Sequence, residues 1–287
     1  MTLKIQKIGV VGAGTMGSGI AQAFAVSGYE VVLRDIAQGA LDHARSVVES
    51  SLGRLVSKNK LEAAAAEAAL GRIKTTLAVE DFHDADLVVE AVLEKFEVKK
   101  AIFSELDRVV RDDAVLASNT SSISLTKIAA ATKIPSRVIG MHFFNPVPMM
   151  ALVEIIRALQ TSDEVAAAVT SLVSAIGKDA RVARDSYGFV VNRVLIPMIN
   201  EAINCVYENV ATPEDVDAMM KLGAAHPMGP LSLGDLIGLD IVLDVMETLY
   251  AGFNDPKFRP SPLLKQMCDA GYLGRKTKRG FFDYSAK

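Results

Sequence analysis

Two residues near the middle of the chain have the types and spacing of a proton-transferring pair. His142 ends one apolar segment and precedes a proline-flanked loop, and Glu154 follows that loop, inside a second apolar segment. A carboxylate among aliphatic side chains is costly to bury without a partner, and an imidazole is a suitable partner. The pair predicts a general base, His142, whose tautomer and protonated form Glu154 supports.

Each of these residues also has an ordinary structural interpretation. A single histidine after a strand is more often a hydrogen-bonding residue of the framework, and Glu154 could point to solvent by strand alternation. Without the evidence for a nucleotide-binding fold, this structural interpretation would be preferred. The acid–base interpretation is favoured because the amino-terminal part of the chain predicts a cofactor site in the same fold.

A glycine-rich turn near the amino terminus predicts that cofactor site. A β-branched run leads into G-A-G-T-M-G at residues 12–17 and then into a helix-forming stretch. In such a strand–turn–helix unit Gly12 allows the tight turn, Gly14 admits a pyrophosphate to the backbone, and Gly17 lets the helix pack on the strand. The helix N-terminus favours the anion. The predicted cofactor contacts of this segment are Gly12, Gly14, Thr15, Met16 and Gly17.

An acidic residue stands where a dinucleotide site needs one. Asp35 comes after the helix-forming stretch that Gly17 opens and beyond the apolar run 29–33. This spacing fits the acid that binds the ribose 2′-hydroxyl, and a carboxylate there favours NAD over NADP. Arg34 beside it can help to accept a 2′-phosphate and leaves that preference open. The alternative, a flavodoxin-like turn and a solvated aspartate, is disfavoured because strand, turn, helix, strand and acid occur in order.

The segment 1–185 predicts a Rossmann-like α/β domain with a doubly wound sheet, because strand- and helix-forming segments alternate. The further strands are expected at 73–75, 86–92, 114–118, 137–142, 151–156 and 180–183. The helix-forming stretch 38–70 is longer than a crossover needs and predicts a projecting helical hairpin. Because ligands bind beyond the carboxyl ends of such strands, residues 90–94, 119–122 and 142–145 are expected to meet at one rim.

The segment 186–287 predicts an all-helical domain that binds substrate and mediates dimerisation, with the boundary near Arg184–Tyr187. Helices are expected at 188–206, from Thr212 onward, and at 236–249. A domain of this size with broad apolar faces often buries them in a second copy, which predicts a homodimer.

Composition excludes several classes of partner. The 287 residues carry a net charge of −3, so no basic field favours nucleic acid. No apolar run reaches the ~20 residues that span a bilayer. Cys205 and Cys268 lack metal-binding spacing, which predicts no metal and a reducing compartment. We therefore expect a soluble, cytoplasmic protein with neither a membrane nor a nucleic-acid partner.

A series of motifs, in order along essentially the whole chain, resembles that of the L-3-hydroxyacyl-CoA dehydrogenases. The motifs are GAGTMG at 12–17, NTSS at 119–122, HFFNP at 142–146 with LVE at 152–154, PMGP at 227–230, IGLD at 237–240, and GRKT at 274–277 with GFFDY at 280–284. Length and layout look most like those of bacterial members that act on 3-hydroxybutyryl-CoA. Lys278 departs from the usual glycine of the family, which bears on the shape of the C-terminal turn.

The resemblance implies an NAD-dependent oxidoreductase that interconverts (S)-3-hydroxyacyl-CoA and 3-ketoacyl-CoA. His142 would take the 3-hydroxyl proton while a hydride passes from C3 to the nicotinamide, and Glu154 would hold it. Ser121 and Asn192 would bind the substrate oxygen. The further contacts that the resemblance implies are Glu94, Lys99, Asn119 and Lys276 with the cofactor, and Arg54 and Lys58 with the coenzyme A phosphates.

These residues have structural alternatives as well. Ser121 could only cap a helix, and Asn192 could satisfy backbone groups in its own helix. Glu94 and Lys99 could form a surface pair of little energetic value, and the basic residues near position 54 could be a solvated face.

Two rival functions share the nucleotide-binding domain. A 3-hydroxyacid or sugar-phosphate dehydrogenase of another class typically uses a lysine in the helical domain, where this chain offers Asn192 and Arg193. A non-catalytic nucleotide-binding structural protein would not need the combination of His142, Glu154, Ser121 and Asn192.

Overall fold

A computed structural model describes residues 3–285 and divides the chain into two compact units. The first unit ends at Ser186 and the second begins at Tyr187. Each unit has a hydrophobic core of its own. Among residues 3–285, no helix combines the length and apolar character that a membrane crossing requires.

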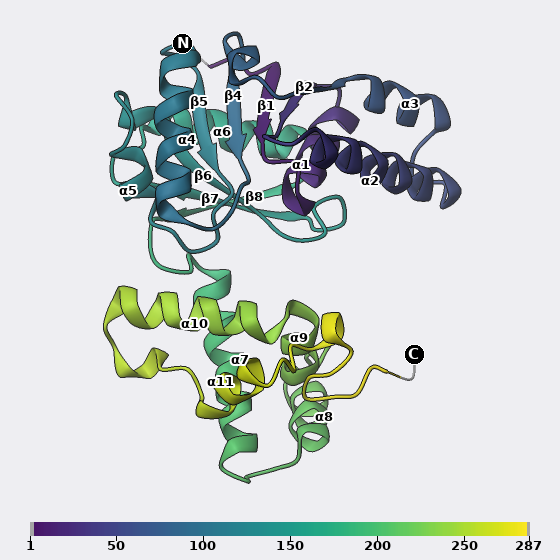
Figure 1. The fold of residues 1–287 in the computed structure, drawn as a ribbon, viewed down its shortest axis with the longest axis vertical. Helices are drawn as coiled ribbons and strands as arrows, with labels where there is room; N and C mark the ends of the chain where they lie inside the picture. Colours follow the sequence, from purple (N-terminus) through teal and green to yellow (C-terminus); the bar gives the residue numbers. More distant parts are fainter. Residues whose placement is uncertain (1–2, 286–287) are drawn as a thin grey trace. The chain divides into compact units, whose positions relative to one another are not determined.

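The first unit alternates strands and helices (Figure 1). Its elements are β1 (Lys7–Val11), α1 (Thr15–Val26), β2 (Glu30–Arg34), α2 (Gln38–Ser57), α3 (Ala63–Gly71), β3 (Ile73–Thr76), η1 (Val79–Phe82), β4 (Leu87–Glu90), α4 (Phe96–Val109), β5 (Val115–Ser118), α5 (Leu125–Ala129), η2 (Pro135–Arg137), β6 (Val138–Phe143), β7 (Leu152–Arg157), α6 (Asp163–Ala175) and β8 (Asp179–Arg184).

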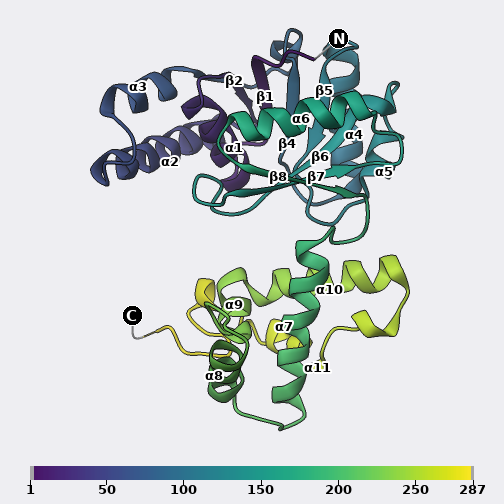
Figure 2. The same cartoon turned by 180° about the vertical axis from the view of Figure 1, so that it is seen from behind.

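The strands form one sheet in the order β3-β2-β1-β4-β5-β6-β7-β8. The first six run parallel, β7 is antiparallel to β6, and β8 is parallel to β7. Helices α4 and α6 cover opposite faces, as the two views show (Figures 1 and 2), so β4, β5 and β6 are buried along their whole length. The predicted Rossmann-like sheet followed by a helical region is confirmed.

The turn between β1 and α1 depends on two glycines. Gly12 has φ 101°, a left-handed conformation that favours glycine. A Cβ on Gly17 would lie 1.7 Å from the carbonyl oxygen of Gly12. The helix can therefore start directly over the end of the strand only because neither residue has a side chain.

Helices α2 and α3 lie side by side near the β2–β3 edge of the sheet (Figure 1). The buried face of α2 is the apolar stripe of Leu41, Ala44, Val48 and Leu52. Both helices also contact α1, which joins this extension to the main core. The end of α2 remains exposed.

The second unit is helical. Its elements are α7 (Val191–Tyr207), α8 (Pro213–Gly223), α9 (Pro230–Ile237), α10 (Leu239–Phe253), η3 (Pro256–Phe258), α11 (Pro262–Asp269) and η4 (Arg275–Thr277). Helix α7 contacts α8, α9, α10 and α11, so it forms the centre of this unit. Thr212 caps α8 as its sequence predicts, because its hydroxyl oxygen accepts a hydrogen bond from Asp215 N at 3.2 Å.

Two of the predicted helix limits are wrong. The helix expected at 236–249 is interrupted at Gly238, whose φ of 106° ends α9 and starts α10 in a new direction. The helix expected from residue 188 begins at Val191, because Gly188 and Phe189 both have positive φ. In both places a left-handed residue breaks an apolar pattern that periodicity alone reads as continuous.

Candidate active site

His142 and Glu154 are directly opposite each other in the antiparallel pair β6–β7. His142 Nδ1 lies 2.7 Å from Glu154 Oε2. Both side chains are buried, with residue exposures of 6% and 3%. His142 and Glu154 are separated in the sequence by the loop that connects β6 to β7. This loop reverses the direction of the chain and so places Glu154 opposite His142.

With Glu154 ionised, this contact assigns the proton of neutral His142 to Nδ1. An ionised carboxylate only accepts, so Nδ1 donates to Glu154 and the lone pair of the neutral ring is on Nε2. Burial strengthens the attraction between this carboxylate and a protonated ring. The arrangement can accept a proton at Nε2 and stabilise the resulting imidazolium, although its catalytic role stays a prediction.

The connection between β6 and β7 is held by Lys178. Its ammonium group donates to the carbonyl oxygens of Val147 and Met150, both at 2.7 Å. Burial lowers the pKa of Lys178. Val147 in turn packs against Gly19 of α1, where a Cβ would lie 2.9 Å from that of Val147. The loop between the two buried residues is therefore tied to the framework.

Asn119 connects the end of β5 to the end of β6. Its side-chain oxygen accepts from the backbone N–H of Phe143 at 2.9 Å, and its own backbone N–H donates to the carbonyl oxygen of Glu90 at 2.8 Å. These bonds fix the residue after His142. The cofactor contact expected of Asn119 stays a prediction.

Ser121 lies at the same rim and is held by Glu94. Glu94 Oε1 accepts from Ser121 N at 2.8 Å and from Ser121 Oγ at 3.2 Å. Burial opposes ionisation, but the Lys99 ammonium and the donors of Thr120 and Ser121 outweigh it and keep the pKa of Glu94 below its ordinary value. The structure thus brings Glu94, Lys99 and Ser121 together.

A cavity of about 870 Å³ opens where the strand order reverses between β1 and β4. The predicted residues on its wall are Gly12, Gly14, Thr15, Met16 and Asp35. Such a switch point is where doubly wound sheets bind nucleotides.

The residues of this cavity fit NAD. A Cβ on Gly14 would meet no other atom within 4 Å, so its backbone is open to a phosphate. Asp35 Oδ2 accepts from Ala13 N at 2.8 Å, which places the carboxylate beside the glycine turn. Gly17 lies beneath the turn and acts by packing, as its contact with Gly12 indicates.

One wall of the cavity was missed by sequence reasoning. It consists of apolar residues at the end of β4 and on one face of α4, namely Ala91, Val92, Leu93, Val98, Ala101 and Ile102. The helical spacing of positions 98, 101 and 102 is a signal that could have indicated it. These side chains suit the flat apolar face of a nucleoside base.

The remaining predicted residues lie on other elements. Arg54 and Lys58 are at the exposed end of α2, where Arg54 Nη1 donates to Ser50 Oγ at 2.9 Å. In the second unit Asn192 is in the first turn of α7, and Lys276 in η4 forms an ion pair with Asp240 at 2.5 Å. Their expected contacts with cofactor or substrate stay predictions.

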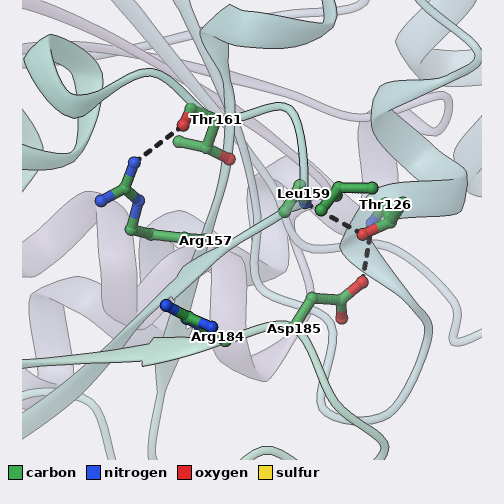
Figure 3. A pocket seen from close by; sticks show the side chains of 7 residues that line it. Thr126, Arg157, Leu159, Thr161, Arg184 and Asp185 are labelled. Atoms are coloured by element: carbon green, nitrogen blue, oxygen red, sulfur yellow. Dashed lines mark hydrogen bonds between the residues drawn. The ribbon is translucent and has the colours of Figure 1, made fainter.

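A second hollow of about 610 Å³ lies at the ends of β7 and β8 (Figure 3). Arg157 and Arg184 are register partners on these strands, and Arg157 forms an ion pair with Asp163 at 2.6 Å. Asp185 accepts from Thr126 N at 2.8 Å, which fastens the end of β8 to α5. No predicted site residue lines this hollow.

Comparison with known proteins relates both units to one family. Residues 7–186 match the NAD binding domain of 3-hydroxyacyl-CoA dehydrogenase, and residues 188–284 match the C-terminal domain of the same family.

Individual relatives match over nearly the whole length. A probable 3-hydroxybutyryl-CoA dehydrogenase of Deinococcus radiodurans is 53% identical, covering 97% of this chain and 100% of its own. A 3-hydroxybutyryl-CoA dehydrogenase of Bradyrhizobium diazoefficiens is 50% identical, covering 99% and 97%. The crystal structure of (S)-3-hydroxybutyryl-CoA dehydrogenase from Ralstonia eutropha superposes with a TM-score of 0.96 at 53% identity, covering 98% of this chain and 100% of that chain.

Proposed function

The chain belongs to the 3-hydroxyacyl-CoA dehydrogenase family, and from this premise we propose that it interconverts (S)-3-hydroxybutyryl-CoA and acetoacetyl-CoA. It is an NAD-dependent oxidoreductase of acyl-CoA substrates. The choice of the four-carbon acyl group rests on relatives that are 53% and 50% identical in sequence and are named as a probable 3-hydroxybutyryl-CoA dehydrogenase and a 3-hydroxybutyryl-CoA dehydrogenase.

One observation carries the proposed chemistry: the 2.7 Å contact between His142 Nδ1 and Glu154 Oε2. Oxidation of a secondary alcohol to a ketone requires the loss of a hydroxyl proton and of a hydride from the same carbon. A neutral imidazole supported by a buried carboxylate is suited to receive the proton. NAD, when bound in the crevice beside Gly12 and Asp35, supplies the acceptor for the hydride.

The residues of the chain act as follows in the oxidation direction. His142 Nε2 takes the proton of the 3-hydroxyl as the hydrogen on C3 leaves with its bonding pair, as a hydride, and the electron pair of the O–H bond forms the second bond of the C3 carbonyl. Glu154 stabilises the imidazolium that results. In reduction the same imidazolium returns its proton to the carbonyl oxygen. Ser121 and Asn192 orient the substrate oxygen and thereby the hydrogen on C3.

Coenzyme A recognition is assigned to the exposed end of α2. Arg54 and Lys58 are exposed there, one turn apart, and neither belongs to an ion pair among the described residues. Guanidinium and ammonium groups bind phosphates by charge-assisted hydrogen bonds.

We also assign dimerisation to the second unit and a cytoplasmic location to the protein. Large apolar side chains are exposed on that unit, including Val194 at 68%, Met219 at 64% and Leu222 at 88%. Such a surface is commonly covered by a second copy. Light scattering after gel filtration should give twice the mass of one chain, and a single-chain mass would refute the dimer.

The decisive experiment is a reductase assay with matched substrates. Absorbance of NADH should fall on addition of acetoacetyl-CoA and stay constant with free acetoacetate. Turnover of the free acid at a similar rate would favour a hydroxyacid dehydrogenase of another class. Absence of turnover with either compound, despite NADH binding, would favour a non-catalytic nucleotide-binding protein.

A further inference from the structure

A row of charged side chains lies below the rim at the carboxyl end of β4. The ammonium group of Lys99 is 2.7 Å from Glu90 Oε1 and 3.2 Å from Glu94 Oε2. The side chains of Lys99 and Glu90 are 1% and 0% exposed. Charges so deeply buried require partners, and each of these has one. Because so little of Lys99 reaches the surface, its position points to a role exerted through its neighbours.

At the outer end of this row of charged groups, one oxygen of Glu94 accepts several hydrogen bonds from the segment that follows β5. Glu94 Oε1 accepts from Thr120 Oγ1 at 2.5 Å, from Ser121 N at 2.8 Å and from Ser122 N at 3.0 Å. The hydroxyls of Ser121 and Ser122 also donate to it, at 3.2 and 3.1 Å. The segment is folded around this carboxylate, so the place of the Ser121 hydroxyl depends on where Lys99 holds Glu94.

At the inner end, Glu90 reaches the same segment by a second route. Glu90 Oε2 accepts from Ser118 Oγ at 2.6 Å, and Ser118 Oγ accepts from Thr120 N at 3.1 Å. Glu90 Oε1 also accepts from Val92 N at 2.7 Å, which fixes the carboxylate itself. Two hydrogen-bonded routes therefore run from Glu90 to the segment that carries Ser121.

We propose that Glu90 and Lys99 are positioning residues for the reaction: acting through Glu94, they hold the Ser121 hydroxyl where it meets the oxygen on C3 of the substrate. This inference rests on the proposed function, because it takes Ser121 as the substrate contact. Neither Glu90 nor Lys99 touches the reacting atoms.

The charge balance explains why Lys99 matters. With Lys99 present, one ammonium group serves two carboxylates. Without it, Glu90 and Glu94 would be neighbouring negative charges with no cation between them, and their repulsion would move Glu94 outward or protonate one of the two. Either outcome changes the acceptor around which residues 120–122 are folded.

A double-mutant cycle tests the proposal. Lys99→Met should lower kcat for acetoacetyl-CoA reduction by roughly 10- to 100-fold, because displacement of an orienting group by about 1 Å has effects of this size. In Glu90→Gln, a residue with no expected cofactor contact, the Kd of NADH, measured by fluorescence, should stay within about twofold of wild type. In a Ser121→Ala background Lys99→Met should add little, because the residue that Lys99 positions is already gone.

Two further variants keep the test decisive. Glu90→Gln preserves volume and should show the same dependence on Ser121, and it decides alone if Lys99→Met does not fold. Asp107→Asn is the matched control, because Asp107 forms a buried ion pair with Arg137 at 2.7 Å near the other end of α4. It should lower thermal stability and leave kcat close to wild type.

The outcomes separate this inference from the proposed function. The inference is overturned if Lys99→Met and Glu90→Gln lower kcat by the same factor with and without Ser121, or if Asp107→Asn lowers kcat as much as they do. Near wild-type turnover of Ser121→Ala alone would also overturn the inference. Reduction of acetoacetyl-CoA by that variant would nevertheless leave the proposed reaction standing. Failure of the wild-type protein to reduce acetoacetyl-CoA would instead refute the proposed function.

Discussion

His142 Nδ1 and Glu154 Oε2 are 2.7 Å apart across two antiparallel strands, β6 and β7, whose register places the two residues directly opposite each other. The only antiparallel pairing in the described sheet is the one that brings them together. A parallel β7 would need a long crossover, and the short connection between the strands could not then return Glu154 to this position. The reversal of strand direction is therefore what creates the pair.

Replacing His142 by Gln should remove most turnover and leave cofactor binding intact. General-base help is worth roughly 10²–10⁴-fold, so kcat should fall within that range. NADH binding, followed by fluorescence, should be unchanged because His142 does not line the nucleotide cavity. His83→Gln, on an exposed turn, is the control. A His142→Gln enzyme with wild-type kcat would refute the assignment.

Replacing Glu154 by Gln should lower the rate of 3-hydroxybutyryl-CoA oxidation and change its pH dependence. The amide keeps the shape but removes the negative charge that stabilises protonated His142. Transfer of the hydroxyl proton to His142 then receives less support, so kcat for oxidation should fall and the pH–rate profile should differ from that of wild type. A profile that coincides with wild type would show that Glu154 does not act on the base.

Replacing Asp35 by Ser should narrow the preference for NADH over NADPH. The substitution removes a charged acceptor for the ribose hydroxyl, worth roughly 10-fold or more in kcat/KM with NADH. It also removes repulsion of a 2′-phosphate, so kcat/KM with NADPH should rise. Asp42→Ser on the exposed face of α2 is the comparison. An unchanged ratio of the two kcat/KM values would place the ribose away from Asp35.

Replacing Arg54 and Lys58 together by Ala should raise KM for acetoacetyl-CoA by roughly 30-fold, since each of the two phosphate contacts by a cation at an exposed site is worth about 1 kcal/mol. kcat should change little, because the contact is remote from C3. With acetoacetyl-pantetheine, which lacks the nucleotide phosphates, the variant should match wild type. Lys100→Ala provides a surface control. An equal effect on both thioesters would contradict phosphate recognition.

Cys268 should react slowly with thiol reagents in the folded protein. Burial first, and then Asp240, Asp269 and Asp244, raise the pKa of the Cys268 thiol to about 11. Since the thiolate is the reactive form, its fraction at pH 8 should be on the order of 100-fold below that of an ordinary thiol. In a Cys205→Ser variant the remaining thiol should react at least that much faster in urea than in buffer, and equal rates would contradict the prediction.

The sequence by itself determined the elements whose signals are local. The turn at residues 12–17, the cap at Thr212 and the buried stripe of α2 are each set by neighbours along the chain, through backbone freedom, hydrogen bonding and helical periodicity. Motifs spread over both units also sufficed to indicate the family.

Tertiary structure alone decided the surroundings of the site. The fold predicted that residues 90–94 and 119–122 would meet at one rim, but no spacing rule indicated which side chains would bond there. The contacts of Glu94 join the segments that follow β4 and β5, and the contact of buried Glu90 joins the end of β4 to Lys99 on α4. The sequence likewise left open whether Glu154 pointed inward. Strand direction and register answered that question, because they depend on long-range backbone pairing that no local pattern contains.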